Sequence, residues 1–225
     1  MFNNAHANVH IPSSLDEVDA DWLTQILQSA RPELVVRAVE QEDVQHGTCT
    51  KLRLRVKTND PTFPETVMLK GGFEPHSALM AGMHMNEMRA YRDYLPTVQA
   101  NRPECYFAGA SDEGRAVVIM EDLRPSTPKF LNLLDPIGYD LAARFLEELA
   151  QTHAVWWGSG ELDRDGRFNW APRPVEGRYV DYMNRLTAPE HFDRFLRAPR
   201  GASTPRALTD PEKIRRGLVA MRDLY

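Results

Sequence analysis

Cysteine is scarce in this sequence, with only Cys49 and Cys105 among 225 residues. Two cysteines exclude a disulfide-rich scaffold and a zinc site built on cysteine ligands, and they favour the reducing cytoplasm as the compartment. Long apolar runs are also lacking, since no stretch reaches the roughly 18 uncharged residues that a membrane-spanning helix needs. The N-terminal segment MFNNAHANVHIPSS has neither a basic start nor an apolar core, so it does not have the features of a signal peptide.

Lysine and net positive charge are equally limited. The formal net charge is −5 and the isoelectric point is about 5.8, which argues against a strongly basic nucleic-acid-binding protein. The 27 basic residues comprise 22 arginines and only 5 lysines, so a lysine beside apolar residues is a candidate for a specific role. Hydrophobic residues make up 42% and charged residues 26%, which is typical of a globular chain rather than a disordered one.

The first half of the chain carries mainly strand patterns. A capping box at Ser14 and Glu17 precedes a short helix around Trp22. The β-rich stretches are residues 34–39, 51–56, 67–70, 105–108 and 116–120. A helix over residues 81–95 separates the third stretch from the fourth. In the second stretch the even-numbered residues are apolar and the odd-numbered ones basic, which indicates a strand with one buried face.

The second half of the chain changes to helical patterns. Asp135-Pro136 is a typical helix start, and apolar residues follow at helical spacing as far as about Trp157. Three shorter helices are predicted over residues 178–186, 189–197 and 211–224, the last beginning at Asp210-Pro211. A sheet with one inserted helix, followed by a helical region, predicts two lobes that meet near residues 121–128.

Several segments together match the motifs of a known family, in order and in rough spacing. They are residues 47–54, 67–70, 86–91, 118–123 and 149–157. Over about residues 20–160 the chain resembles the aminoglycoside phosphotransferase and choline and ecdysteroid kinase-like family, which has a protein-kinase-like fold. The resemblance implies an α+β fold, with a kinase-like N-lobe in residues 1–123 and a partial, mainly helical C-lobe in residues 124–225. The N-lobe would hold a five-stranded antiparallel sheet and one helix besides the N-terminal helix.

The same resemblance implies ATP as the phosphoryl donor, Mg²⁺ as cofactor and a small-molecule alcohol as acceptor. Lys70 would contact the α- and β-phosphates, and Glu87 would hold Lys70 in place. Met120 would line the back of the adenine pocket, and adenine would bond to the Glu121 carbonyl and the Leu123 N–H. For Lys70, the alternative is a lysine at a strand end that extends to solvent. For Glu87, it is a helix carboxylate that faces solvent. For residues 120–123, it is a strand that simply ends at two charges.

Gly47 and Thr48 lie at the expected turn between the first two strands. In the resembled family this turn covers the phosphates with its backbone. Here it has a single glycine in place of a Gly-x-Gly-x-x-Gly loop, so a plain hairpin turn stays open as the alternative.

A catalytic loop is not recognisable in the sequence. The resembled enzymes carry a His-Gly-Asp motif, an asparagine about five residues later and a further metal-binding aspartate. The one His-x-Asp in the chain is His191-Phe192-Asp193, which lies in an amphipathic helical pattern and has Ala198 where the asparagine would stand. No catalytic residue and no metal ligand are therefore assigned. His153 is expected to be a buried, hydrogen-bonded packing residue.

We therefore expect a truncated phosphotransferase chain that lacks its catalytic loop and is inactive by itself. The alternative is a natural, non-catalytic nucleotide-binding or interaction module with a kinase-like N-lobe. The helices expected over residues 136–157 and 211–224 would carry uncovered apolar faces and so favour self-association.

Overall fold

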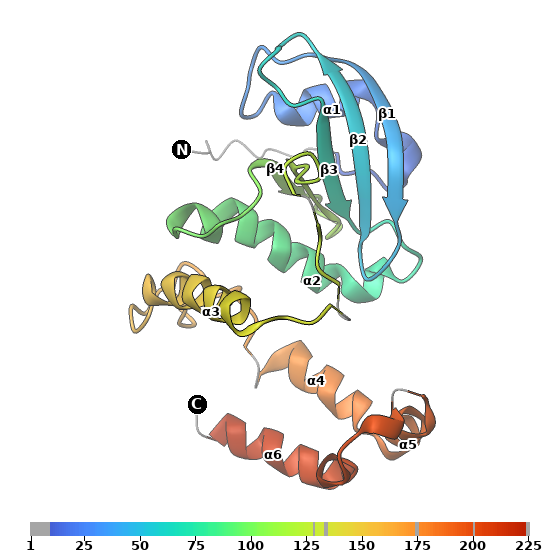
Figure 1. The fold of residues 1–225 in the computed structure, drawn as a ribbon, viewed down its shortest axis with the longest axis vertical. Helices are drawn as coiled ribbons and strands as arrows, with labels where there is room; N and C mark the ends of the chain where they lie inside the picture. Colours follow the sequence, from blue (N-terminus) through green and yellow to red (C-terminus); the bar gives the residue numbers. More distant parts are fainter. Residues whose placement is uncertain (1–9, 128, 133–134, 174–175, 200, 224–225) are drawn as a thin grey trace. The chain divides into compact units, whose positions relative to one another are not determined.

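The computed structural model describes residues 10–127, 129–132, 135–173, 176–199 and 201–223, so most of the expected tail over residues 1–12 lies outside the described part. The chain forms two compact units, Met1–Asn169 and Trp170–Tyr225. The elements of the first unit (Figure 1) are α1 (Ala20–Leu27), β1 (Val36–Gln45), β2 (Thr50–Thr58), β3 (Thr66–Gly71), α2 (Ser77–Arg89), β4 (Cys105–Ala110), β5 (Ala116–Glu121) and α3 (Tyr139–Ala154).

The five strands form one sheet in the order β1-β2-β3-β5-β4, and every neighbouring pair is antiparallel. This confirms the predicted five-stranded antiparallel sheet, with α2 as the helix between its third and fourth strands. In β2, Leu52, Leu54 and Val56 are buried as the alternation predicted. Their burial fixes the register, because a shift by one residue would turn all three side chains to the other face.

The two faces of the sheet are covered by different helices. On one face, Leu23 and Ile26 of α1 pack with Leu52 and other strand residues in the larger apolar core. On the other face, Met88 of α2 packs with Val118 and its neighbours in a smaller core. The candidate site lies on this second face, which we call the α2 side of the sheet.

Two helices begin at residues other than the predicted ones. Helix α2 begins at Ser77, before the predicted residue 81, and is followed by a π-helical turn and a 3₁₀ turn. Helix α3 begins at Tyr139, after the predicted Pro136. The Asp135 carboxylate does not cap α3, because it pairs with Lys129 at 3.3 Å and accepts a hydrogen bond from the Asn132 N–H at 2.8 Å.

Helix α3 and the residues that follow it belong to the first unit. The Tyr94 hydroxyl donates a hydrogen bond to the Thr152 carbonyl at 3.3 Å. Phe168 is fully buried and makes edge contacts with the rings of Tyr94 and Trp156. These contacts attach residues beyond 123 to the unit that contains the sheet, and this unit ends at Asn169. The lobe boundary expected at residue 123 is a different boundary, and it stays a prediction.

The second unit contains the three predicted C-terminal helices: α4 (Gly177–Leu186), α5 (Pro189–Arg197) and α6 (Pro211–Asp223). Helix α6 is capped as predicted, because the Asp210 carboxylate accepts hydrogen bonds from the Glu212 and Lys213 N–H groups at 2.9 and 3.2 Å. In the described parts of both units, no helix is both long enough and apolar enough to cross a membrane.

Candidate functional site

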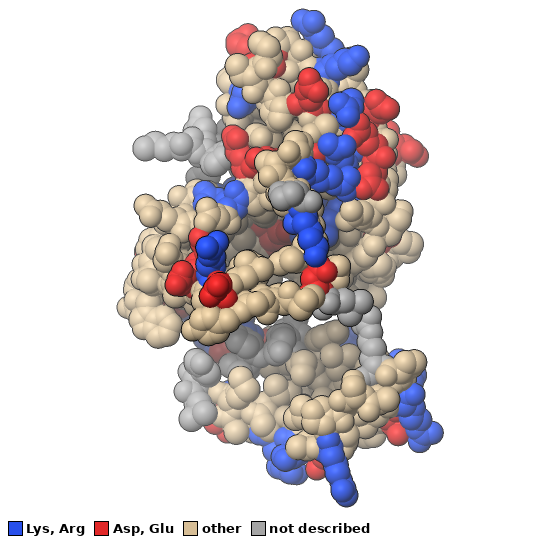
Figure 2. All heavy atoms as spheres, in the orientation of Figure 1, with Lys and Arg blue, Asp and Glu red and all other residues tan. Residues whose placement is uncertain are grey.

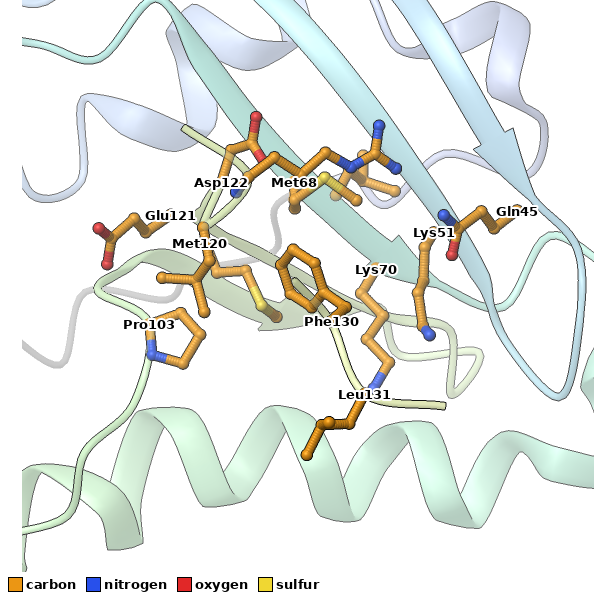
Figure 3. A pocket seen from close by; sticks show the side chains of 13 residues that line it. Gln45, Lys51, Met68, Lys70, Pro103, Met120, Glu121, Asp122, Phe130 and Leu131 are labelled. Atoms are coloured by element: carbon orange, nitrogen blue, oxygen red, sulfur yellow. The ribbon is translucent and has the colours of Figure 1, made fainter. Parts of the chain in front are cut away.

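A cavity of about 480 Å³ opens on the α2 side of the sheet (Figure 3), and its volume is typical of small-molecule sites. Its walls come from the four strands β1, β2, β3 and β5, from Pro103, from the segment after β5, and from a short stretch at residues 130–131. The sulfur-containing side chains of Met68 and Met120 make one part of the lining apolar. The amino groups of Lys51 and Lys70 make another part positive (Figure 3).

Lys70 on β3 and Glu87 on α2 form an ion pair, with 2.5 Å between Lys70 Nζ and Glu87 Oε1. Their side chains are 26% and 30% exposed. The buried Met88 anchors α2 on the sheet and thereby brings the adjacent Glu87 within reach of β3. The structure thus confirms the predicted proximity of this pair. A charge-assisted bond of this length fixes the lysine at the cavity, where it can meet a negative group.

The turn at Gly47 and Thr48 connects β1 and β2 as expected, but neither residue lines the cavity. The Gly47 carbonyl accepts a hydrogen bond from the His76 ring at 3.0 Å, and the Thr48 carbonyl accepts one from the His84 ring at 3.2 Å. Glu74 accepts a further hydrogen bond from the Thr50 hydroxyl at 2.6 Å. The turn is therefore held down on the chain that leads from β3 into α2. No local pattern in the sequence indicated this role for the two histidines.

The predicted adenine-binding segment lies at the end of β5, and Met120, Glu121 and Leu123 all line the cavity. The Glu121 N–H donates a hydrogen bond to the carbonyl of Glu104, the residue before β4, at 2.8 Å. Within the described chain, no protein acceptor takes the Leu123 N–H, whereas the Leu123 carbonyl accepts from the turn that follows it. A backbone donor is therefore available here to a ligand.

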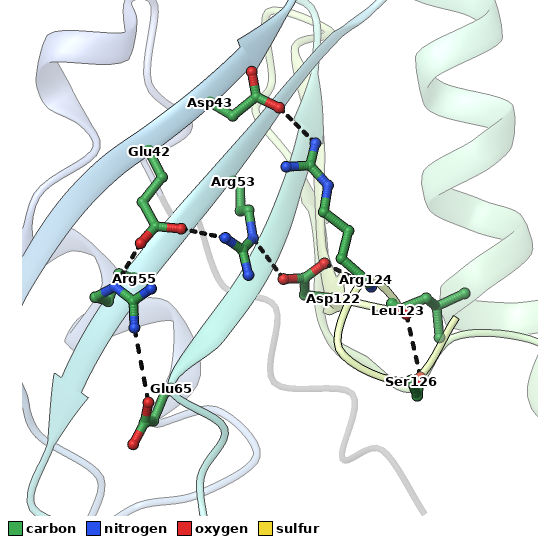
Figure 4. Close-up of polar contacts among 9 residues, drawn as sticks. All are labelled: Glu42, Asp43, Arg53, Arg55, Glu65, Asp122, Leu123, Arg124 and Ser126. Carbon is green, nitrogen blue, oxygen red and sulfur yellow. Dashed lines mark hydrogen bonds and ion pairs between the residues drawn. The ribbon is translucent and has the colours of Figure 1, made fainter. Parts of the chain in front are cut away.

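Ion pairs that the sequence analysis did not find fix this segment to β1 and β2 (Figure 4). Arg53 Nε donates to the Asp122 carboxylate at 2.7 Å, and the Asp122 side chain is only 1% exposed. Arg124 pairs with Asp43 at 2.6 Å. Glu42 accepts from both Arg53 and Arg55. Figure 2 shows acidic and basic side chains interspersed over this part of the unit. The alternating arginines of β2 were the only sequence signal for these contacts.

Burial raises the pKa of Asp122, but the hydrogen bonds from Arg53, from the Arg124 N–H and from Thr66 together outweigh it. The net result is a pKa below the ordinary value of an aspartate. Asp122 is therefore a charged, buried residue that holds the adjacent backbone in place. Its carboxylate already accepts hydrogen bonds from protein donors.

The remaining histidine and aspartate candidates are not among the residues that line the cavity. His153 is exposed on α3, so the expectation of a buried histidine is wrong; the apolar face of this helix is itself exposed. Asp193 lies on α5 and pairs with Arg197 at 2.8 Å, and its rejection as a catalytic residue stays a prediction. Among the described residues, no group of three or more potential metal ligands was found.

Comparison with known proteins identifies the chain at the family level. The model of the ecdysteroid kinase-like family matches residues 43–188, which is more than half of the chain and includes Lys70, Glu87 and the segment after β5. No curated protein and no solved structure gave a match. The cavity with its Lys70–Glu87 pair, the antiparallel sheet and the family match agree with one another, and the chain belongs to the ecdysteroid kinase-like family.

Proposed function

We propose that this member of a kinase-like phosphotransferase family binds an adenine nucleotide in the cavity on the α2 side of the sheet. The phosphates would lie at Lys70, and the base would lie between Met120 and the Leu123 N–H. The observation that carries the proposal is the Lys70–Glu87 ion pair at the same cavity as an unused backbone donor. The cavity offers the ammonium group of Lys70 in one place and the Leu123 N–H in another. This arrangement suits a ligand that carries negative charge at one end and a hydrogen-bond acceptor at the other.

For the phosphoryl transfer of the family, which residues 1–225 alone are not expected to perform, we propose as acceptor the hydroxyl group of a small molecule in the cytoplasm. The family implies Mg²⁺ as cofactor, but the described residues do not form a binding site for this ion. Glu87 is engaged by Lys70, Asp122 is engaged by Arg53, and no cluster of further ligands lies among the described residues. We therefore assign no step to Mg²⁺ in this chain.

We also propose that residues 1–225 bind nucleotide without transferring its terminal phosphoryl group. Transfer requires a group that orients the acceptor hydroxyl, in addition to charge neutralisation. Asp193, the aspartate of the only His-x-Asp sequence, is paired with Arg197 on a helix. This observation favours a second candidate function, that of a non-catalytic nucleotide-binding module.

The proposal is tested by titration with a fluorescent ATP analogue. Lys70→Ala should weaken binding about tenfold, because one charge-assisted contact is worth about 1.5 kcal/mol or more. Lys57→Ala is the matched control, since Lys57 is an exposed lysine of β2 that does not line the cavity. Equal affinity of the wild type and Lys70→Ala would contradict the assignment of the phosphates to Lys70.

A further inference from the structure

Lys51 is the second lysine of the cavity, and the assignments above give it no role. It is the first residue after Thr50 in β2, and it lies directly opposite Lys70 in the antiparallel pairing of β2 with β3. Residues opposite each other in such a pair project from the same face of the sheet. Figure 3 shows both side chains extending from neighbouring strands into the cavity.

The two lysines differ in their partners. Lys70 is paired with Glu87 at 2.5 Å. Lys51 is exposed, and within the described part of the chain it makes no ion pair and no side-chain hydrogen bond. Lys70 therefore has a carboxylate partner at the cavity, and Lys51 has none.

Two like charges directly opposite each other on neighbouring strands destabilise a sheet. Arginine, the residue that this chain uses for 22 of its 27 basic positions, occurs elsewhere on β2 with carboxylate partners. Lys51 has no such partner, so we expect its charge opposite Lys70 to cost the free protein a small amount of stability, which the Glu87 carboxylate beside Lys70 reduces. A ligand with several negative charges would remove this repulsion and gain a second contact.

We propose that Lys51 is a second phosphate-binding residue of the nucleotide site, which acts beside Lys70 on a nucleoside polyphosphate. This inference rests on the proposed function. Lys70, held by Glu87, fixes one phosphate group at a set position. Lys51 has a flexible side chain without a competing carboxylate, so it can follow the phosphates that extend beyond Lys70. The site thereby distinguishes a nucleoside triphosphate from the nucleoside, which has no charge for Lys51 to meet.

The experiment measures the affinity of ATP and of adenosine by calorimetry for the wild type, Lys51→Gln and Lys57→Gln. Lys51→Gln should weaken ATP about tenfold and leave adenosine unchanged, because only the phosphates contact the ammonium group. Lys57→Gln removes the same charge from the same strand outside the cavity, and it should leave both affinities unchanged. Lys51→Arg keeps the charge and should retain most of the ATP affinity.

Thermal unfolding without ligand provides a second measurement. Lys51→Gln should unfold at a temperature equal to or higher than that of the wild type, since it removes a like-charge contact. Unchanged ATP affinity in Lys51→Gln, or an equal loss for ATP and adenosine, would overturn the inference while leaving the role of Lys70 intact. Absence of ATP binding by the wild type itself would overturn the proposed function together with this inference.

Discussion

Gly72 shows how a single missing side chain shapes the site. It follows β3 directly, and a Cβ atom at this position would lie 2.6 Å from His84 Nδ1 and 3.2 Å from Ser77 Cβ. His84 is 7% exposed, and its ring reaches the Thr48 carbonyl at 3.2 Å. The absence of a side chain at residue 72 therefore lets the imidazole of α2 pass close to the backbone and hold the β1–β2 turn.

Gly72→Ala should consequently destabilise the protein. We expect a loss of about 1–3 kcal/mol in the free energy of unfolding, the usual cost of inserting a group into a packed site. Urea denaturation measures this loss, and the same substitution in a His84→Ala background is the control. In that background the cost of Gly72→Ala should be clearly smaller, because the clashing ring is gone. An equal cost in both backgrounds would show that the His84 contact does not determine the choice of glycine.

The segment that follows β5 is held by side chains from elements far away in the chain. Arg53 of β2 reaches the buried Asp122, and Arg124 reaches Asp43 of β1. Asp122→Ala removes the hydrogen bonds that this carboxylate accepts, while Arg53 keeps Glu42 as a partner. Because hydrogen bonds to a charged group contribute about 1.5–3 kcal/mol, we expect Asp122→Ala to lower the free energy of unfolding by about that amount. Glu65→Ala is the control, since Glu65 belongs to the same network but its side chain is 88% exposed.

The contribution of Asp122 should also depend on pH. Its pKa is lowered in the folded protein, so its stabilising effect is present above the pKa of an unfolded aspartate and is lost as the pH falls through the folded value. The difference in unfolding free energy between the wild type and Asp122→Ala should therefore be constant near neutral pH and shrink in acid. Urea denaturation across this pH range tests it. A difference that does not change with pH would mean that the loss reflects packing rather than charge.

The elements of the fold differ in how far local sequence predicts them. The sheet was predictable because the alternation in β2 has a period of two residues that burial must respect. The two Asp-Pro helix starts look alike in sequence, but only Asp210 caps a helix. Asp135 instead contacts Lys129 and the Asn132 backbone, and a sequence pattern cannot show such a competing partner.

The same limit applies to the candidate site. The Lys70–Glu87 pair was predictable because family motifs fix the position of both residues. The contact of Arg53 with Asp122 joins residues 69 positions apart, and that of His84 with Thr48 joins residues 36 positions apart. Only the sheet register and the approach of α2 bring these residues together, so neither contact has a local signature. The pairing of Lys51 with Lys70 likewise depends on the register of β2 and β3.

The two units of the molecule differ most in their buried apolar surface. The first unit contains both apolar cores, which cover the two faces of its sheet. Its helix α3 nevertheless exposes Phe145, Leu146 and Leu149 by 50%, 66% and 49%. This exposed face has the character that we expected to favour self-association, which remains a prediction. In the second unit, Thr187 is the one described residue that is buried, and it is polar.

We therefore predict that residues 170–225 do not fold when they are produced alone. Their helices contain 10, 9 and 13 residues, and isolated helices shorter than about 12–15 residues are marginal in water. Without a buried apolar cluster among the described residues, the helices gain little free energy from packing against one another to offset the entropy of ordering the chain. Far-ultraviolet circular dichroism of this segment should show little helix and no cooperative thermal transition. Residues 1–169, which hold both cores, should unfold cooperatively under the same conditions. A cooperative transition in the isolated 170–225 segment would contradict the prediction, because it would require a core that the described burial does not contain.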